Sequence, residues 1–184
     1  MNQKLFLIIN SFANKNPILD KVGISISEYT PYIFILIEIY FYFVAKKKNE
    51  SIFAFNSMLI ALFLSKLIGK FYIHNRPSVD KIGTTLVKHK PDGSFPSDHT
   101  TFIFALAITL FIFNKNKLVG SLLILLAFLG GIGRIFVGVH YPFDIIGAII
   151  LAIFSSTIIY IFRKKLQFIN DFIFKIENMF LGKK

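Results

Sequence analysis

Long apolar runs alternate with short polar clusters along most of the chain. A helix needs about 20 mostly apolar residues to cross a bilayer. Five runs approach that length, at residues 29–45, 51–73, 99–113, 118–137 and 143–162. The pattern therefore predicts a bundle of five transmembrane helices. The third run is short and begins with polar residues, so we expect its first turn to lie within the protein rather than in lipid.

The two ends of the chain show a weaker pattern. Residues 3–12 have an apolar face with polar breaks, and residues 166–181 carry apolar groups at helical spacing. Such segments are typical of amphipathic helices that lie at a membrane interface. For residues 3–12 the sequence leaves open whether they span, lie flat or pack against the bundle. With no internal repeat, residues 1–184 are expected to form a single membrane-embedded domain.

Composition agrees with a membrane protein. Hydrophobic residues make up 54% of the 184 positions, charged residues only 17%, and the mean hydropathy is +0.63. Soluble domains carry about a quarter of charged residues. The fold class predicted is therefore an all-α integral membrane protein. The chain has no cysteine, which excludes disulfides, thiolate catalysis and cysteine-based metal sites.

The net charge of +11 would suggest a nucleic-acid partner in a soluble protein. Here the basic residues instead form short clusters between apolar runs, at 46–48, 115–117 and 163–165. If all five runs span, these clusters lie on one side, which the distribution of positive charge assigns to the cytoplasm. Membrane lipids are the expected partners and nucleic acid is not. The connections 74–98 and 138–142 then face outward.

Polar groups that a bilayer tolerates poorly gather in three stretches, at residues 74–77, 94–101 and 134–144. Each stretch lies at the end of a predicted spanning helix, on the outward side. Ionisable residues at such places are candidates for function. Two Arg, two His and one Asp converging there would make an anion site, because Arg forks match phosphate oxygens and a helix N-terminus offers free N–H groups.

The two histidines of these stretches suggest covalent catalysis with distinct roles. His140 has Asp144 four residues later, and a carboxylate that fixes the imidazole tautomer is what a nucleophile needs. His99 has only the adjacent Asp98, whose side chain points elsewhere on a helix, so His99 is predicted to be the general acid and base. The phosphate cradle is predicted to comprise Arg76, Ser97, Arg134 and the amides near Asp98 and His99.

These residues resemble the type-2 phosphatidic acid phosphatase superfamily, whose signature is Lys-x6-Arg-Pro, Pro-Ser-Gly-His and Ser-Arg-x5-His-x3-Asp. The second part reads Pro-Ser-Asp-His at residues 96–99, and the third matches Arg134, His140 and Asp144. More finely, the chain resembles bacterial undecaprenyl-diphosphate phosphatases of the bacitracin-resistance type. They show Ser-Phe-Pro-Ser-Asp-His-Thr-Thr, as at 94–101, and Arg-Ile-x-Val-Gly-x-His-Tyr-Pro-x-Asp, as at 134–144.

This resemblance implies hydrolysis of undecaprenyl diphosphate to undecaprenyl phosphate and phosphate, through a phosphohistidine. It implies no metal and no cofactor. It also implies a place in the bacterial plasma membrane, with the active site on the extracytoplasmic side. The function implied is recycling of the lipid carrier for peptidoglycan synthesis, with bacitracin resistance as a consequence.

Besides Asp98 in place of the Gly of the second motif, the sequence departs from the signature at two further positions. Gly69 stands where the first motif has Lys, and Gly133 stands where the third has Ser before Arg134. On a helix, Lys66 lies about 60° and Lys70 about 100° from the face of residue 69. Either could replace the missing Lys. The phosphate-binding residues expected, taking Lys70 as the candidate, are Arg76, Ser97, Asp98, Arg134 and Lys70.

Other interpretations remain open at this point. The substrate could be phosphatidylglycerophosphate or a diacylglycerol diphosphate. The same anion site could serve a lipid carrier or flippase without hydrolysis, or a phosphotransferase that passes phosphate to an alcohol. His74 and His89 are interpreted as loop or interface histidines. The glycines at 130, 131 and 133 are interpreted as a small-residue strip for helix packing. The sequence does not give the oligomeric state.

Overall fold

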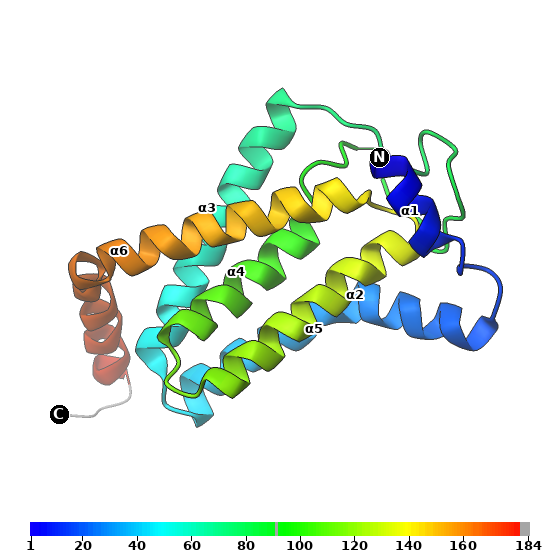
Figure 1. Cartoon of the computed structure of the whole chain (residues 1–184). Coiled ribbons are helices and arrows are strands. Elements are labelled where there is room, and N and C mark those ends of the chain that lie inside the picture. The colour runs from blue at the N-terminus through cyan, green and yellow to red at the C-terminus, as the bar shows by residue number, and fades with distance from the viewer. Residues whose placement is uncertain (91, 181–184) are drawn as a thin grey trace.

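The computed structural model describes residues 1–90 and 92–180, and helices are its only regular secondary structure there (Figure 1). Four stretches are long and apolar enough to cross a membrane: 17–44, 48–71, 117–136 and 142–180. The predicted class, an all-α membrane bundle, is confirmed. The elements are α1 (Asn2–Asn10), α2 (Pro17–Ile39), the π-helical turn η1 (Tyr40–Val44), α3 (Lys48–Phe71), α4 (Asp98–Phe113), α5 (Lys117–Phe136) and α6 (Pro142–Phe180).

Helix α4 lies at the centre of the bundle, between α3, α5 and α6 (Figure 1). Its side chains form much of the core, and Phe104, Leu106 and Leu110 are almost fully buried. With 16 residues it is only roughly 24 Å long at 1.5 Å per residue. Thr100 and Thr101 in its polar first turn are fully buried, which agrees with the prediction that this turn packs within the protein.

Helix α2 begins earlier than predicted. The side chain of Asn16 accepts hydrogen bonds from the amides of Ile18 (2.9 Å) and Leu19 (3.2 Å), and Pro17 takes the first helical position. The first amides of a helix have no partner within the helix. An Asn side chain before the helix can accept hydrogen bonds from them, and a Pro at the first position has no amide N–H to leave unpaired. The predicted start at residue 29 was wrong because the polar residues between 20 and 28 interrupt the apolar run.

The predicted separation of a fifth spanning helix from an interfacial helix was also wrong, because α6 runs without a break to Phe180. No Gly or Pro occurs between residues 163 and 180 to end it. The helix bends instead, and its last part runs steeply to the rest (Figure 1). There the amide of Asn170 donates to Asn49 (2.8 Å). The predicted segment ended at 181, which lies outside the described residues.

The two ends of the bundle differ. The predicted basic connections meet at one end, where Lys47 Nζ donates to Asn114 Oδ1 (2.6 Å) across the α2–α3 and α4–α5 turns. The other end gathers α1, the connection 72–97 and the start of α6 (Figure 1). Helix α1 packs there on α5 and α6, and the amide of Asn10 donates to the carbonyls of Thr84 (2.7 Å) and Phe136 (2.9 Å). Residues 3–12 therefore pack against the bundle.

Candidate active site

His140 and Asp144 come together at the turn from α5 to α6. Gly138 has φ +81°, and a Cβ there would lie 2.2 Å from the carbonyl oxygen of Thr84, so only glycine fits this turn. His140 Nδ1 lies 3.4 Å from Asp144 Oδ2. The same carboxylate oxygen accepts hydrogen bonds from the Tyr141 amide (2.8 Å) and from the Ser94 hydroxyl. With Nδ1–H facing this carboxylate, the lone pair of Nε2 is directed into the site.

Arg76 lies directly on that nitrogen. Its Nη1 is 3.0 Å from His140 Nε2 and also donates to the carbonyl of Val139 (3.0 Å). Nε donates to Asp92 Oδ1 (2.9 Å), and Nη2 contacts the same oxygen (2.9 Å) and the carbonyl of Gly93 (3.2 Å). Four of these contacts are hydrogen bonds, and the Nη2–Asp92 contact is an ion pair. The protein thus contacts all three nitrogens of the Arg76 guanidinium.

Arg134, at the end of α5, is held on one side only. It is 1% exposed, and its Nη1 donates to Ser27 Oγ (3.1 Å) and Glu28 Oε1 (2.7 Å) on α2. Its Nε and Nη2 have no hydrogen-bond partner among residues 1–90 and 92–180. These two nitrogens form one edge of the guanidinium, the edge that binds a carboxylate or phosphate with two parallel hydrogen bonds.

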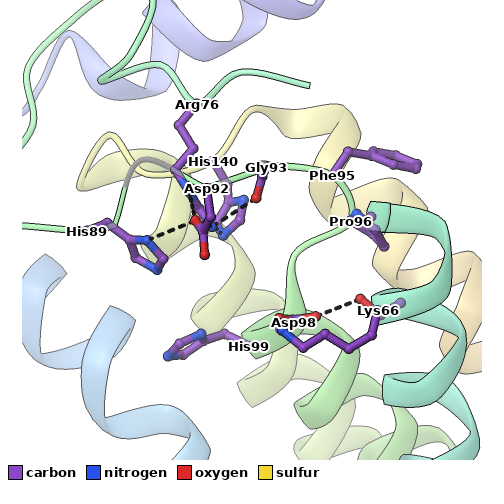
Figure 2. A pocket seen from close by; sticks show the side chains of 12 residues that line it. Lys66, Arg76, His89, Asp92, Gly93, Phe95, Pro96, Asp98, His99 and His140 are labelled. Atoms are coloured by element: carbon purple, nitrogen blue, oxygen red, sulfur yellow. Dashed lines mark hydrogen bonds and ion pairs between the residues drawn. The ribbon is translucent and has the colours of Figure 1, made fainter. Parts of the chain in front are cut away.

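A cavity of about 320 Å³ opens beside His140 and Arg76. Figure 2 shows Arg76, His140 and Asp92 together on one side of it, with His99 and the Asp98–Lys66 pair on the other. Asp98 accepts a hydrogen bond from Ser65 Oγ (2.7 Å) and pairs with Lys66 Nζ. The cavity therefore brings together both predicted catalytic histidines, one of the two predicted arginines and the Asp that marks the second motif.

Two other predicted phosphate-binding residues, Ser97 and Lys70, do not line this cavity. Ser97 is fully buried and caps α4, because its Oγ lies 3.4 Å from the Thr100 amide and accepts from the Thr100 hydroxyl (3.0 Å). Lys70 is exposed, whereas Lys66 lines the cavity. The geometry thus favours Lys66 over Lys70 as the lysine nearest the site. Arg134 is not among the lining residues either, but it lies close enough for its charge to lower the pKa of His89, which lines the cavity.

Sequence reasoning missed two residues that line the cavity, His89 and Asp92. Burial and then the charge of Arg76 lower the pKa of His89, and Arg134 acts in the same direction. Burial alone would raise the pKa of Asp92, but its hydrogen bond to Arg76 and the charge of Arg76 hold it below its ordinary value. Both residues belong to an irregular loop, where no periodic pattern indicates which side chains turn inward.

Ser94 and His74 were also not assigned to the site. Ser94 bonds Asp144, as described above, and its place in the stretch 94–101 was the signal that could have found it. His74 Nδ1 lies 3.6 Å from Asp144 Oδ1. Its role as a loop histidine stays a prediction. No group of three His, Cys, Asp or Glu is arranged to hold a metal ion among the residues that the structure describes.

The profile of the PAP2 superfamily matches residues 51–168. The chain belongs to the PAP2 superfamily. Among its relatives, undecaprenyl-diphosphatase BcrC of Bacillus subtilis (strain 168) is 32% identical over 185 residues, covering 100% of this chain and 95% of the relative. A protein of Bacillus licheniformis named bacitracin transport permease protein BcrC is 31% identical over 186 residues, covering 97% and 89%.

Two solved structures share the fold. LpxE of Aquifex aeolicus superposes with a TM-score of 0.71 at 25% identity, covering 85% of this chain and 93% of that one. A transmembrane PAP2-type phosphatidylglycerolphosphate phosphatase from Bacillus subtilis gives a TM-score of 0.67 at 22% identity, covering 89% and 87%. The predicted family, the membrane fold and the class of enzyme, a lipid phosphatase, are confirmed by these comparisons.

Proposed function

We propose that this protein hydrolyses undecaprenyl diphosphate to undecaprenyl phosphate and inorganic phosphate. One observation carries the proposal: His140, oriented by Asp144, directs Nε2 toward Arg76 at a cavity that His99 also lines. A nucleophile, a phosphate-binding cation and an acid are thus gathered in one place. Similarity over the full length to a protein named undecaprenyl-diphosphatase supports this choice of lipid.

The reaction proceeds in two displacements at phosphorus. Nε2 of His140 attacks the terminal phosphorus, a nitrogen–phosphorus bond forms, and the bond to the bridging oxygen breaks. His99 gives its proton to the departing lipid phosphate. His99 then takes a proton from water, the water oxygen attacks phosphorus, and the electron pair of the nitrogen–phosphorus bond returns to His140. Arg76, the free edge of Arg134 and the first amides of α4 stabilise the equatorial oxygens, while Ser97 holds the start of α4 in place as its cap.

The first displacement requires a local exchange of hydrogen bonds. Arg76 Nη1 occupies the lone pair of His140 Nε2 at 3.0 Å. When a phosphate oxygen enters, it takes over this N–H and releases the nitrogen for attack. The exchange is small, because Arg76 keeps its contacts to Asp92, Val139 and Gly93 throughout.

A second depression, of about 330 Å³, gives the lipid tail a way out of the cavity. It shares Asp98 and His99 with the first, and its walls are mostly apolar side chains of α2, α3 and α4, including Pro31, Leu62 and Phe102. The diphosphate would lie beside Arg76 and His140 while the isoprenoid chain passes His99 toward the bilayer. In this pose the leaving oxygen lies next to the proposed acid.

We further propose that the protein resides in the bacterial plasma membrane with this cavity on the extracytoplasmic side. The basic turns around Lys47 and Lys117 lie at the opposite end of the bundle, and positive charge accumulates on the cytoplasmic side of membrane proteins. An N-terminal tag, close to the cavity end in Figure 1, is expected to be accessible only from outside the cell.

The decisive assay measures phosphate release from undecaprenyl diphosphate by the purified protein in detergent, with EDTA present. We expect full activity with EDTA and a loss of at least about 10⁴-fold in His140→Ala. Gln167→Ala, a change at a partly exposed residue on the last part of α6, away from the cavity, is the matched control. Wild-type activity in His140→Ala, or complete loss with EDTA, would overturn the mechanism.

The same assay separates the other interpretations. Phosphatidylglycerophosphate and a diacylglycerol diphosphate, offered in parallel, are expected to give a lower kcat/KM than the polyprenyl substrate. A lipid carrier would move lipid between leaflets even in His99→Ala and His140→Ala. A phosphotransferase would transfer the phosphoryl group to an added alcohol, and correspondingly less free phosphate would be released.

A further inference from the structure

Helix α2 contributes two polar side chains to the site although it lies outside the stretch that matches the PAP2 superfamily, residues 51–168. Ser27 and Glu28 both accept hydrogen bonds from Arg134 Nη1, at 3.1 and 2.7 Å. Neither residue belongs to the motifs on which the family assignment rests. The Glu28 side chain is 44% exposed and lines the second depression beside Asp98 and His99, so its carboxylate lies next to the site as well as to Arg134. An ionisable residue on a spanning helix at such a place is a candidate for function.

The hydrogen bonds of Arg134 indicate that Ser27 and Glu28 orient its guanidinium and do not merely neutralise its charge. A guanidinium buried only for structural reasons is normally bonded all round. The α2 pair takes Nη1 alone, and the Nε–Nη2 edge has no partner among residues 1–90 and 92–180. The contact therefore fixes the rotation of the group while leaving its two-pronged edge for another anion.

The backbone next to Arg134 supports the same arrangement. A Cβ on Gly133 would lie 3.1 Å from the Ser27 amide nitrogen and 3.2 Å from Ile26 Cγ2. Helix α2 thus approaches α5 so closely that glycine is favoured where the family motif has Ser. The hydroxyl that a Ser would bring is absent from residue 133, and Ser27 supplies one to Arg134 from the neighbouring helix.

We propose that Glu28, assisted by Ser27, is a positioning residue that aims the free edge of Arg134 at the substrate phosphate. This inference rests on the proposed function, since Arg134 is there a phosphate ligand. Glu28 acts only through Arg134. Its removal lets the guanidinium rotate, and displacement of a binding group by about 1 Å can reduce the rate about 100-fold.

The test is a double-mutant cycle. Glu28→Gln is expected to lower kcat/KM by about 10- to 100-fold in the wild-type background. In an Arg134→Ala background it is expected to change kcat/KM less than about 2-fold, because residues that act as a unit are not additive. Glu38→Gln, on the same helix but bonded to Ser51 at the far end, is the matched control and is expected to leave kcat/KM unchanged.

A binding measurement makes the outcome independent of lipid hydrolysis. Orthovanadate, a mimic of the transferring phosphoryl group, should raise the melting temperature of the wild type and of Glu38→Gln, but not of Glu28→Gln. Ser27→Ala leaves no charge unpaired and should weaken vanadate binding less than Glu28→Gln does. It is the test variant to use if Glu28→Gln does not fold. Unchanged vanadate binding in Glu28→Gln and in Ser27→Ala would overturn the proposal. So would losses of kcat/KM from Glu28→Gln and Arg134→Ala that simply multiply in the double mutant. Vanadate binding without hydrolysis of any lipid would instead refute the proposed function.

Discussion

The two arginines of the site are held in opposite ways. Asp92 contacts the Nε–Nη2 edge of Arg76. The nitrogens of Arg76 also reach two backbone carbonyls and His140. Glu28 and Ser27 hold only Nη1 of Arg134, and its edge has no partner in the part of the chain that the structure describes. From this difference we infer that Arg76 is held in a fixed position beside the nucleophile, whereas Arg134 has a free edge that can bind an anion.

The two contacts also differ in setting. Arg76 is anchored by a carboxylate on a loop at the cavity rim, where the Asp92 side chain is 59% exposed. Arg134 is anchored from a membrane helix, by a Glu28 side chain that is 44% exposed. Both carboxylates therefore reach solvent, which screens charge pairs, and the two settings differ only modestly. The larger consequences are expected at Arg134 because its Nε–Nη2 edge has no partner among residues 1–90 and 92–180.

The largest effect is expected for Arg134→Lys. The ammonium can still pair with Glu28 but offers no two-pronged edge, so kcat/KM should fall by about 100- to 1,000-fold. The melting temperature should change by less than about 4 °C, the equivalent of roughly 1 kcal/mol in a chain of this size. Phosphate release and thermal unfolding in detergent measure the two quantities. A small loss of rate would mean that the open edge is not used.

Arg76→Lys is expected to affect rate and stability together. The carbonyls of Val139 and Gly93 and the Asp92 carboxylate lose donors that a Lys cannot replace. We expect kcat/KM to fall by about 10- to 100-fold and the melting temperature to fall by roughly 5 °C. If Arg76→Lys and Arg134→Lys gave the same pattern, the distinction between the two arginines would be lost.

Asp92→Asn tests the rim anchor alone. The exposed pair is expected to contribute at most about a 5-fold difference in kcat/KM. Its effect on stability should depend on pH. The pKa of Asp92 is lowered in the folded state from its ordinary value of 3.8. The ionised carboxylate therefore stabilises the folded protein at pH values above its ordinary pKa. This contribution is lost as the pH falls through the lower pKa of the folded state. Melting temperatures of both proteins should converge in that acid range.

The smallest effect is expected at the lysine of the cavity. Lys66→Ala should raise KM about 2- to 3-fold, because Lys66 is an exposed partner of Asp98 and lines the cavity. Lys70→Ala provides the matched comparison and should leave KM unchanged, since Lys70 lies outside the cavity lining. The reverse order would return Lys70 to the role that the sequence suggested.

Much of this architecture could be predicted from the sequence, because it depends on local pattern. The lengths of the apolar runs indicated the bundle, and the polar runs at their ends indicated which end carries the site. His140 and Asp144 lie four residues apart, so their contact follows from the turn and first helical residues that join them. The basic clusters likewise indicated the opposite end, where Lys47 bonds Asn114.

Contacts that depend on tertiary packing could not be predicted. Glu28 and Arg134 are 106 residues apart and meet only through the packing of two helices. Asp92 reaches Arg76 through an irregular loop, where sequence spacing does not fix direction. The choice between Lys66 and Lys70 depends on the rotation of α3 about its own axis. The bend of α6 could not be predicted either, because no Gly or Pro occurs between residues 163 and 180 to mark it.

The central claim is that His140 attacks phosphorus while the arginines hold the phosphate, and one measurement tests it most directly. The protein is mixed with undecaprenyl diphosphate labelled in the terminal phosphate and quenched within milliseconds in base, and the labelled peptide is identified by mass spectrometry. We predict an acid-labile phosphohistidine at His140 that forms at least as fast as turnover and is absent in Arg134→Ala. A label on His99, or steady phosphate release with no labelled histidine, would contradict it.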